Sequence, residues 1–160
     1  ESSMNIFERL LILIFNTTSY RFYRRKYMLP SGFRFNGYFI RLFGDGDIRV
    51  GENSYISFFS YINVSEGTRV NIGSDVAIGH NVKIYTSQVD THAMITSGVK
   101  KSLMGDVTIG DNVLIGANVF ITPGVCIGSN VVIGANSFVN SNVESNCVAV
   151  GSPCKVVRSY

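Results

Sequence analysis

A branched apolar residue returns at every sixth position along much of this chain, and few backbones accommodate that spacing. The clearest series consists of Ile109, Ile115, Ile121, Ile127, Ile133 and Val139. Glycine follows four of these residues directly. An α-helix repeats about every 3.6 residues and a strand every second residue, so a strict period of six indicates neither a long helix nor a long strand. The same spacing occurs upstream, in a block of Val50, Ile56 and Ile62 and in a block of Ile72, Ile78 and Ile84.

Six residues suit a short strand followed by a sharp corner, and three such units make one coil of about 18 residues. The apolar residue points inward and stacks on its copies in neighbouring coils, about 4.8 Å away. The tripeptides at the expected corners are GHN, GDN, GAN and GSN, and Gly, Asn and Asp tolerate left-handed backbone best. We therefore interpret Asn112, Asn118 and Asn130 as turn residues without a catalytic role. The repeat predicts an all-β protein built as a parallel β-helix.

The repeat is interrupted twice. Ile62 and Ile72 lie ten positions apart, which indicates one irregular turn. A longer excursion covers residues 85–107, with the sequence YTSQVDTHAMITSGVKKSLMGDV. Loops longer than about 12–15 residues inside a compact domain are usually functional or disordered. The Ser, Thr and Gly content of this loop favours an extended arm over a helix. The loop contains His92, one of only two histidines in the chain.

Composition excludes several classes of protein. The chain has 160 residues, enough to bury a core within one domain, and 46% of them are hydrophobic, which argues against disorder. Cys126, Cys147 and Cys154 fit neither a disulfide framework nor a CxxC metal pattern, so they indicate a reducing compartment and ordinary packing. We predict no metal site. No apolar run reaches the 18 or so residues of a spanning helix, and no cleavable signal is evident.

Charge divides the chain near the sequence FGDGDI. Residues 1–44 hold seven Lys or Arg against two acids, and residues 45–160 hold seven against nine. We therefore place a boundary between a basic, aromatic and partly helical N-terminal segment, residues 1–44, and a β-helix domain, residues 45–160.

The hexapeptide pattern resembles the hexapeptide-repeat acyltransferases, whose fold is a left-handed parallel β-helix. The resemblance covers about residues 45–160 and is close over residues 106–158, which are similar to the sugar and antibiotic O-acetyltransferase branch. That branch usually has Trp where this chain has Leu114, and it usually ends Gly-x-Pro-Ala-Lys where this chain has Cys154 in place of Ala. The left hand, a homotrimeric assembly and acetyl-CoA as the acyl donor are implied by this resemblance.

His92 matches the place where members of the resembled family carry their general base. Acyl transfer from a thioester to a hydroxyl requires removal of the hydroxyl proton, and a neutral imidazole suits that task near pH 7. Direct attack needs no covalent nucleophile if the two substrates are held together. Asp90 could orient His92, although two residues of separation on an irregular loop is weak support. An ordinary loop histidine is the alternative interpretation of His92.

The second histidine and the loop lysines have simpler interpretations. His80 occupies a corner position that Asp111, Ala117 and Ser129 fill in other repeats, so we interpret it as structural. Lys100 and Lys101 are more typical of a solvated loop tip, although they could meet a phosphate or an acidic sugar.

The resemblance also implies a donor site. A small residue after the repeat glycine would let the pantetheine arm lie against the coils, and Ala117 and Ala135 match that position. Plain corner packing is the alternative for both. Asn140 and Ser141 match residues that contact the donor after the following strand. Arg158, with Lys155 close by, matches a basic residue that would bond to the nucleotide phosphates.

The N-terminal segment admits three interpretations. NIFERLLILIF predicts a short apolar helix, and YRFYRRKY places four cations among aromatic residues. The segment could cap the open edge of the first coil. It could also lie on anionic lipid, and the first two interpretations are compatible. Nucleic acid is the third, but no nucleic-acid module is recognisable, so we predict none as a partner. We predict a cytoplasmic protein, with the inner face of the membrane as the alternative.

Together these observations predict an acetyl-CoA-dependent O-acetyltransferase that acts on a sugar hydroxyl, in surface polysaccharide biosynthesis. One alternative is another acceptor, such as the amine of an amino-sugar nucleotide or the hydroxyl of serine. A catalytically silent structural β-helix is the other. The zinc carbonic anhydrases that share the resembled fold need three histidine ligands, and this chain has two histidines.

Overall fold

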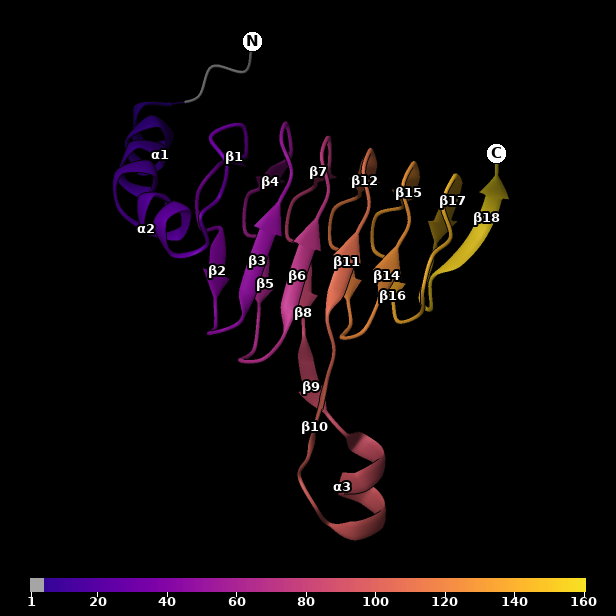
Figure 1. The fold of residues 1–160 in the computed structure, drawn as a ribbon. Coiled ribbons are helices and arrows are strands. Elements are labelled where there is room, and N and C mark those ends of the chain that lie inside the picture. The colour runs from indigo at the N-terminus through magenta and orange to yellow at the C-terminus, as the bar shows by residue number, and fades with distance from the viewer. Residues whose placement is uncertain (1–4) are drawn as a thin grey trace.

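Most of the chain winds into a triangular β-helix, with helices at its N-terminal end and an arm that leaves its middle (Figure 1). The computed structural model describes residues 5–160. Sheet A contains β1 (Arg34–Asn36), β4 (Tyr55–Ser57), β7 (Ala77–Ile78), β12 (Val113–Ile115), β15 (Val131–Ile133), β17 (Cys147–Val150) and β18 (Lys155–Ser159). Sheet B contains β2 (Arg41–Phe43), β5 (Tyr61–Asn63), β8 (Lys83–Tyr85), β13 (Phe120–Ile121) and β16 (Phe138–Val139). Sheet C contains β3 (Asp47–Val50), β6 (Arg69–Ile72), β11 (Val107–Ile109) and β14 (Cys126–Ile127).

The period of six arises because the chain passes from sheet A to sheet B to sheet C, one short strand at a time. Pairing inside each of these sheets is parallel except for β18, which runs antiparallel to β17. Repeat residues meet in register: Ile121 pairs with Ile84 on one side and with Val139 on the other. All three side chains are buried. The predicted β-helix core is therefore confirmed.

The corner asparagines are turn residues, as the tripeptides predict. Asn112, Asn118 and Asn130 all have φ between 54° and 60°, in the left-handed region that asparagine tolerates. Their side chains also form ladders between coils. The amide of Asn112 donates to Asn130 at 2.9 Å, and that of Asn118 donates to Asn136 at 3.0 Å.

The β-helix begins earlier than the predicted boundary at residue 45. Residues 34–36 in β1 and residues 41–43 in β2 already pair in parallel with β4 and β5. The N-terminal segment is therefore only partly outside the coils. Its charge differs from that of the later coils because charge reports exposed side chains, whereas coil formation depends on the buried ones, such as Phe35 and Leu42.

Two helices precede the first coil, α1 (Ile6–Thr17) and α2 (Ser19–Lys26). Asn5 begins α1 with a capping box, in which its side chain accepts from the backbone N–H of Glu8. α2 packs onto the first coil through Tyr20, whose ring stacks on Phe35 with centroids 4.3 Å apart. No helix in the described part of the chain is long and apolar enough to cross a membrane.

The phenol of Tyr20 makes the stability of this N-terminal cap sensitive to alkaline pH. Its hydroxyl donates to Gly37 O at 2.9 Å and accepts from Ile40 N. Burial raises the pKa of Tyr20 from 10.0 to about 12. The folded chain therefore keeps this proton at pH values where the unfolded chain releases it, so the free energy of unfolding falls as pH rises from about 10 towards 12.

Tyr20→Phe tests this dependence by urea unfolding at several pH values. At pH 8 we expect the variant to be less stable by about 1 kcal/mol, because it lacks the two hydroxyl hydrogen bonds. The gap between wild type and variant should shrink as the pH rises above about 10. A difference in the free energy of unfolding that stays constant up to pH 11 would contradict the raised pKa of Tyr20.

The arm contains a helix, so the expectation of an extended arm without one was wrong. β9 (Ser87–Val89) and β10 (Ser102–Met104) pair antiparallel and support α3 (Thr91–Ser97) at the tip. Asp90 caps this helix by accepting from the N–H of Ala93 at 2.9 Å, and Gly98 ends it with φ of 68°. Local capping of this kind offsets the weak helix propensity of the Ser and Thr residues.

Candidate functional site

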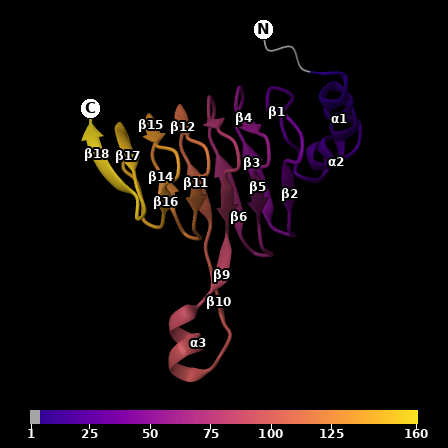
Figure 2. The same cartoon turned by 180° about the vertical axis from the view of Figure 1, so that it is seen from behind.

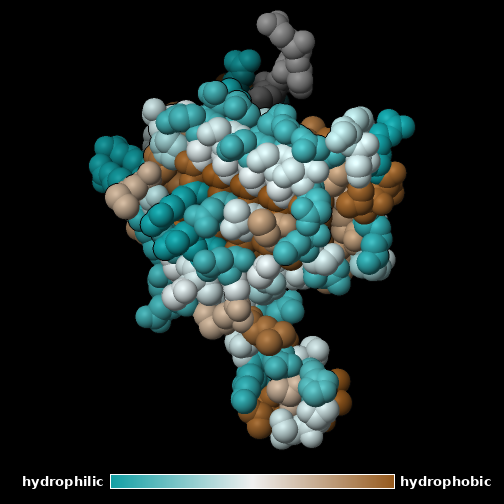
Figure 3. Space-filling view, turned by 45° about the vertical axis from the view of Figure 1, so that its right-hand side comes forward, coloured by the Kyte–Doolittle hydropathy of each residue, from teal (hydrophilic) through white to brown (hydrophobic). Residues whose placement is uncertain are grey.

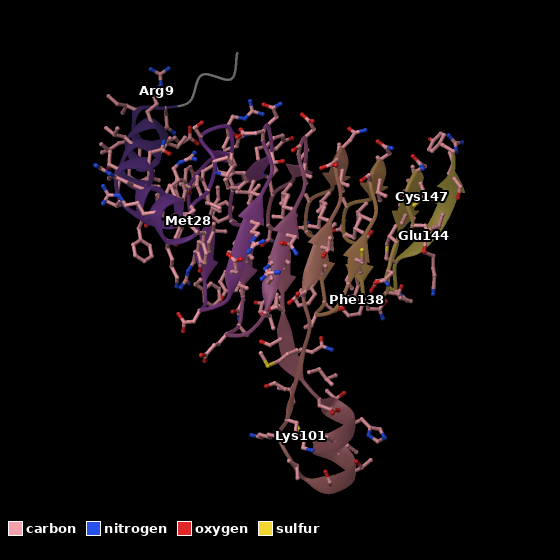
Figure 4. The ribbon with its side chains drawn as sticks, in the orientation of Figure 1. Arg9, Met28, Lys101, Phe138, Glu144 and Cys147 are labelled. Carbon is pink, nitrogen blue, oxygen red and sulfur yellow. The ribbon has the colours of Figure 1, made fainter. Side chains whose placement is uncertain are left out.

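His92 lies in the first turn of α3, exposed at the tip of the arm. The arm stands clear of the coils in both ribbon views and in the space-filling view (Figures 1, 2 and 3). The side chain of Lys101 also lies out on the arm, away from Phe138 and Glu144 on the coils (Figure 4). Within one chain, then, the predicted base is not beside the predicted donor residues.

Asp90 is occupied by helix capping. Its Oδ1 accepts from Ala93 N, and its backbone N–H donates to Lys101 O at 2.8 Å. No hydrogen bond joins the carboxylate of Asp90 to the ring of His92 in the described part of the chain. Asp90 therefore positions the turn that carries His92 and does not orient the imidazole through a hydrogen bond of its own.

Ala117 and Ala135 do come together, at the corner between sheets A and B, which we call the A/B corner. They occupy the same place in successive coils, and the N–H of Asn136 donates to Ala117 O at 2.9 Å. The coils approach so closely that a Cβ on Gly116 would lie 2.5 Å from Ala135 N. Because neither alanine side chain extends past Cβ, the backbone is left uncovered at these two positions, beside the ladder of Asn118 and Asn136.

The backbone N–H groups of Ala117 and Ala135 form no hydrogen bond within residues 5–160. The corner between sheets C and A shows why this is unusual. There the N–H of Ser74 donates to Asp111 Oδ1, and the N–H of Asp111 donates to Ser129 Oγ, at 2.8 and 3.0 Å. Each of those corners is capped by a polar side chain from the next coil. An alanine cannot supply that cap, so the A/B corner presents a row of free donors one coil apart.

Lys155 continues this row at the C-terminal end. It begins β18 opposite Val150, and Val150 packs beyond Gly134 in the A/B corner. Arg158 lies further along β18, opposite Val148 and near the ring of Tyr160. Both cations are exposed. The structure thus brings Lys155 close to the alanine corner, with Arg158 on the same strand.

Asn140 and Ser141 lie on the other side of sheet B. They follow β16 at the corner between sheets B and C, which we call the B/C corner, and both are exposed. The arm leaves from the same corner in an earlier coil. One chain therefore divides the predicted site between two corners, with sheet B between them.

The outer surface of sheet B carries a ladder of aromatic rings. Neighbouring centroids lie 4.3 to 5.9 Å apart along the series Phe43, Tyr61, Tyr85, Phe120 and Phe138. These residues are all half-buried in the single chain. Sheet C differs, since Arg49, Asn71 and Thr108 lie in register on its outer surface.

A charged pocket lies where the B/C corner meets sheet C, and the sequence had suggested no function for the residues that line it. Its volume is about 490 Å³, and its lining includes Lys26, Asp45, Asp47, Thr68, Arg69 and Asp106. Arg69 pairs with Asp47 at 3.2 Å, and Lys26 lies 3.5 Å from Asp45. These residues come from four separate stretches of sequence, so only the stacking of the coils and the packing of α2 against them bring the set together.

His80 lies in the same column of the A/B corner as Ala117, one coil earlier, since the N–H of Asn118 donates to His80 O. The ring of His80 packs on Phe58 at 5.4 Å in the A/B corner. Burial raises the pKa of the Cys147 and Cys154 thiols, which makes both poor nucleophiles. Cys126 is exposed on sheet C, which corrects the expectation that all three cysteines are packed inside. In the described residues, no three His, Cys, Asp or Glu side chains gather as metal ligands.

Comparison with known proteins agrees with this architecture. The family model "Bacterial transferase hexapeptide (six repeats)" matches residues 106–141. The galactoside O-acetyltransferase of Escherichia coli (strain K12) is 40% identical over 113 residues, which are 70% of this chain and 54% of that protein. A maltose O-acetyltransferase from Clostridium difficile 630 is 32% identical with a TM-score of 0.68, over 96% of this chain and 84% of that one.

A third relative was solved with a donor. This hexapeptide-repeat acetyltransferase of Vibrio cholerae O1 biovar eltor, complexed with acetyl coenzyme A, is 26% identical with a TM-score of 0.68, over 90% of this chain and 77% of that one. The fold is thus a hexapeptide parallel β-helix of the left-handed class. The chain belongs to the hexapeptide-repeat acetyltransferase family. It spans about half the length of the curated relatives it matches.

Proposed function

We propose that this protein is an acetyl-CoA-dependent O-acetyltransferase that acts on a sugar hydroxyl. The observation that carries the proposal is the row of free N–H groups at Ala117 and Ala135, which leads towards Lys155. An extended chain with amide carbonyls could accept from these donors, and a cation at the end of the row suits a phosphate. Likeness to sugar O-acetyltransferases supports the same class of donor and acceptor.

In the proposed reaction, neutral His92 removes the proton of the acceptor hydroxyl while its oxygen attacks the thioester carbonyl. The C–O bond forms, and the carbonyl oxygen becomes an oxyanion that a backbone N–H can stabilise. Collapse of this intermediate breaks the C–S bond, and the leaving thiolate takes the proton from His92. The products are an O-acetyl ester and a free thiol, with no covalent enzyme intermediate.

We also propose a homotrimer, in which sheet B of each copy faces the threefold axis. In that arrangement the A/B corner of one copy lies beside the B/C corner of the next. The donor row of Ala117 and Ala135 then meets Asn140, Ser141 and the arm of a neighbour, so His92 completes a shared site. The half-buried aromatic ladder on sheet B supports this choice of face, because such rings gain most from burial. A monomer with full activity would contradict the proposal.

The acceptor is best supported as a polyhydroxyl compound. The charged pocket where the B/C corner meets sheet C offers carboxylate acceptors and cationic donors, which suit hydroxyl groups. We propose a sugar, with a surface glycan as the more specific candidate. An amine of an amino-sugar nucleotide and the hydroxyl of serine remain alternative acceptors in the same site.

The experiment measures free thiol released from acetyl-CoA against a panel of sugars, nucleotide sugars and serine. Release with one acceptor class would support the reaction and name that class. If no acceptor gives release, the melting temperature with and without acetyl-CoA decides the next step. A rise would indicate donor binding with an untested acceptor, whereas no rise would favour a structural role.

A further inference from the structure

The outward side of α1 is apolar and uncovered. Ile6, Leu10 and Leu13 lie on one side of the helix and are 87%, 52% and 58% exposed. Phe7 and Ile14 extend the same strip at 64% and 46%. A helix at the surface of a globular domain normally turns polar residues outward. This helix therefore presents a continuous apolar strip that the described chain leaves in water.

The exposed strip is separate from the side by which α1 attaches to the protein. The ring of Phe15 packs on Tyr20 at 5.5 Å and on Phe39 at 5.2 Å, while Leu11 and Ile12 are half-buried. Figures 1 and 2 place α1 at the N-terminal end of the coil stack, beyond β1. The helix thus has two apolar sides, and attachment to the coils uses only one of them.

Exposed positive charge lies on α1 itself and on the neighbouring helix α2. Arg9 projects away from the body of the molecule (Figure 4), and Arg21 and Arg25 are exposed on α2 with Phe22 between them. None of these three arginines belongs to an ion pair within residues 5–160. The acidic side chain of the two helices in that range is Glu8, which accepts from the N–H of Asn5 in the capping box. Apolar and cationic side chains together suit an anionic, apolar partner.

We propose that α1 docks on an anionic lipid surface, with its exposed apolar strip in the interface and the arginines at the headgroups. A helix of 12 residues is about 18 Å long, too short to cross a bilayer but sufficient to lie in its surface. A second copy of the chain is a weaker candidate, because a symmetric contact would set arginine against arginine. This inference goes beyond the proposed reaction and does not depend on it.

Vesicle flotation tests the proposal with the full chain and two lipid compositions. One vesicle is pure phosphatidylcholine, and the other contains about one third phosphatidylserine. We expect binding to the anionic vesicle to be at least about tenfold stronger, and to weaken at 0.5 M salt because the charges are screened. Equal binding to both vesicles, or no binding to either, would overturn the proposal.

Two double variants separate the apolar strip from the charges. Leu10→Gln with Leu13→Gln and, separately, Arg21→Gln with Arg25→Gln should each lower binding to the anionic vesicle at least about tenfold. The matched control removes two exposed cations elsewhere, Lys100→Gln with Lys101→Gln, and should bind as wild type does. Circular dichroism must show unchanged melting for every variant.

Light scattering tests whether a second copy of the chain, rather than lipid, covers the exposed strip of α1. If the leucine variant lowers the molar mass in solution and neither vesicle binds the wild type, the strip is a contact between copies and the lipid proposal is wrong. If the molar mass is unchanged and vesicle binding falls, the strip is a lipid-binding surface. A leucine or arginine double variant that binds the anionic vesicle as strongly as wild type does would also contradict the lipid proposal.

Discussion

Replacing His92 by alanine is expected to lower kcat for acetyl transfer by about 10²–10⁴-fold, the usual contribution of a positioned general base. The fold should be unaffected, because the side chain is exposed at the tip of the arm and supports no buried contact. Donor binding should also persist, since the free N–H groups of Ala117 and Ala135 belong to a different part of the chain. The measurements are thiol release and the rise in melting temperature with acetyl-CoA.

The matched control is His80→Ala, which removes the chain's other histidine. His80 is also exposed, and its ring packs on Phe58 rather than lying on the arm. We expect this variant to keep most of the wild-type rate. A His92→Ala variant within about threefold of the wild-type rate would show that the base lies elsewhere. An equal loss in both variants would indicate a structural cause.

Replacing Ile121 by alanine is expected to destabilise the fold by about 2–5 kcal/mol. Ile121 is fully buried and lies between Ile84 and Val139 in the stacked interior of sheet B. Removing its outer carbons leaves a cavity, because coils held by parallel hydrogen bonds on both sides cannot move together to close it. Urea unfolding at one fixed protein concentration measures the loss.

Leu103→Ala provides the control for this stability prediction, since it deletes the same number of carbon atoms. Leu103 is 48% exposed on β10 of the arm, outside the coils. Its removal should change the free energy of unfolding by less than about 0.5 kcal/mol. If both variants lost similar stability, the coil interior would not be the source of stability that the register indicates.

Much of the coil architecture follows from the sequence, because each repeat position has a single environment in every coil. Ile115 and Ile133 are equivalent residues in successive coils and both point inward, so the same type of side chain recurs at this position. Corner asparagines recur for the same reason. The boundary at residue 45 was less accurate. Phe35 and Leu42 fill the inward positions of the first coil that isoleucine fills in later coils, so the repeat is not evident there.

The candidate site could be predicted only in parts. Repeat spacing places Ala117 and Ala135 in one column, and the long interruption of the repeat singles out His92. Their separation within one chain could not be predicted, because it depends on where the arm points. The free N–H groups of Ala117 and Ala135 could not be predicted either. Whether a corner N–H has a hydrogen-bond acceptor depends on which side chain the next coil places beside it.

The sequence by itself determined the winding of the chain and the residue types at its corners and core, because these depend on a local period repeated in every coil. The helix in the arm is capped locally by Asp90 and Gly98, so its signal was present in the sequence although we expected no helix there. Tertiary structure alone decided the charged pocket, the division of the site across sheet B and the uncovered strip of α1. Each of these depends on contacts between segments far apart in sequence. A hydrophobic residue such as Leu10 looks the same in the sequence whether it is packed inside or left in water.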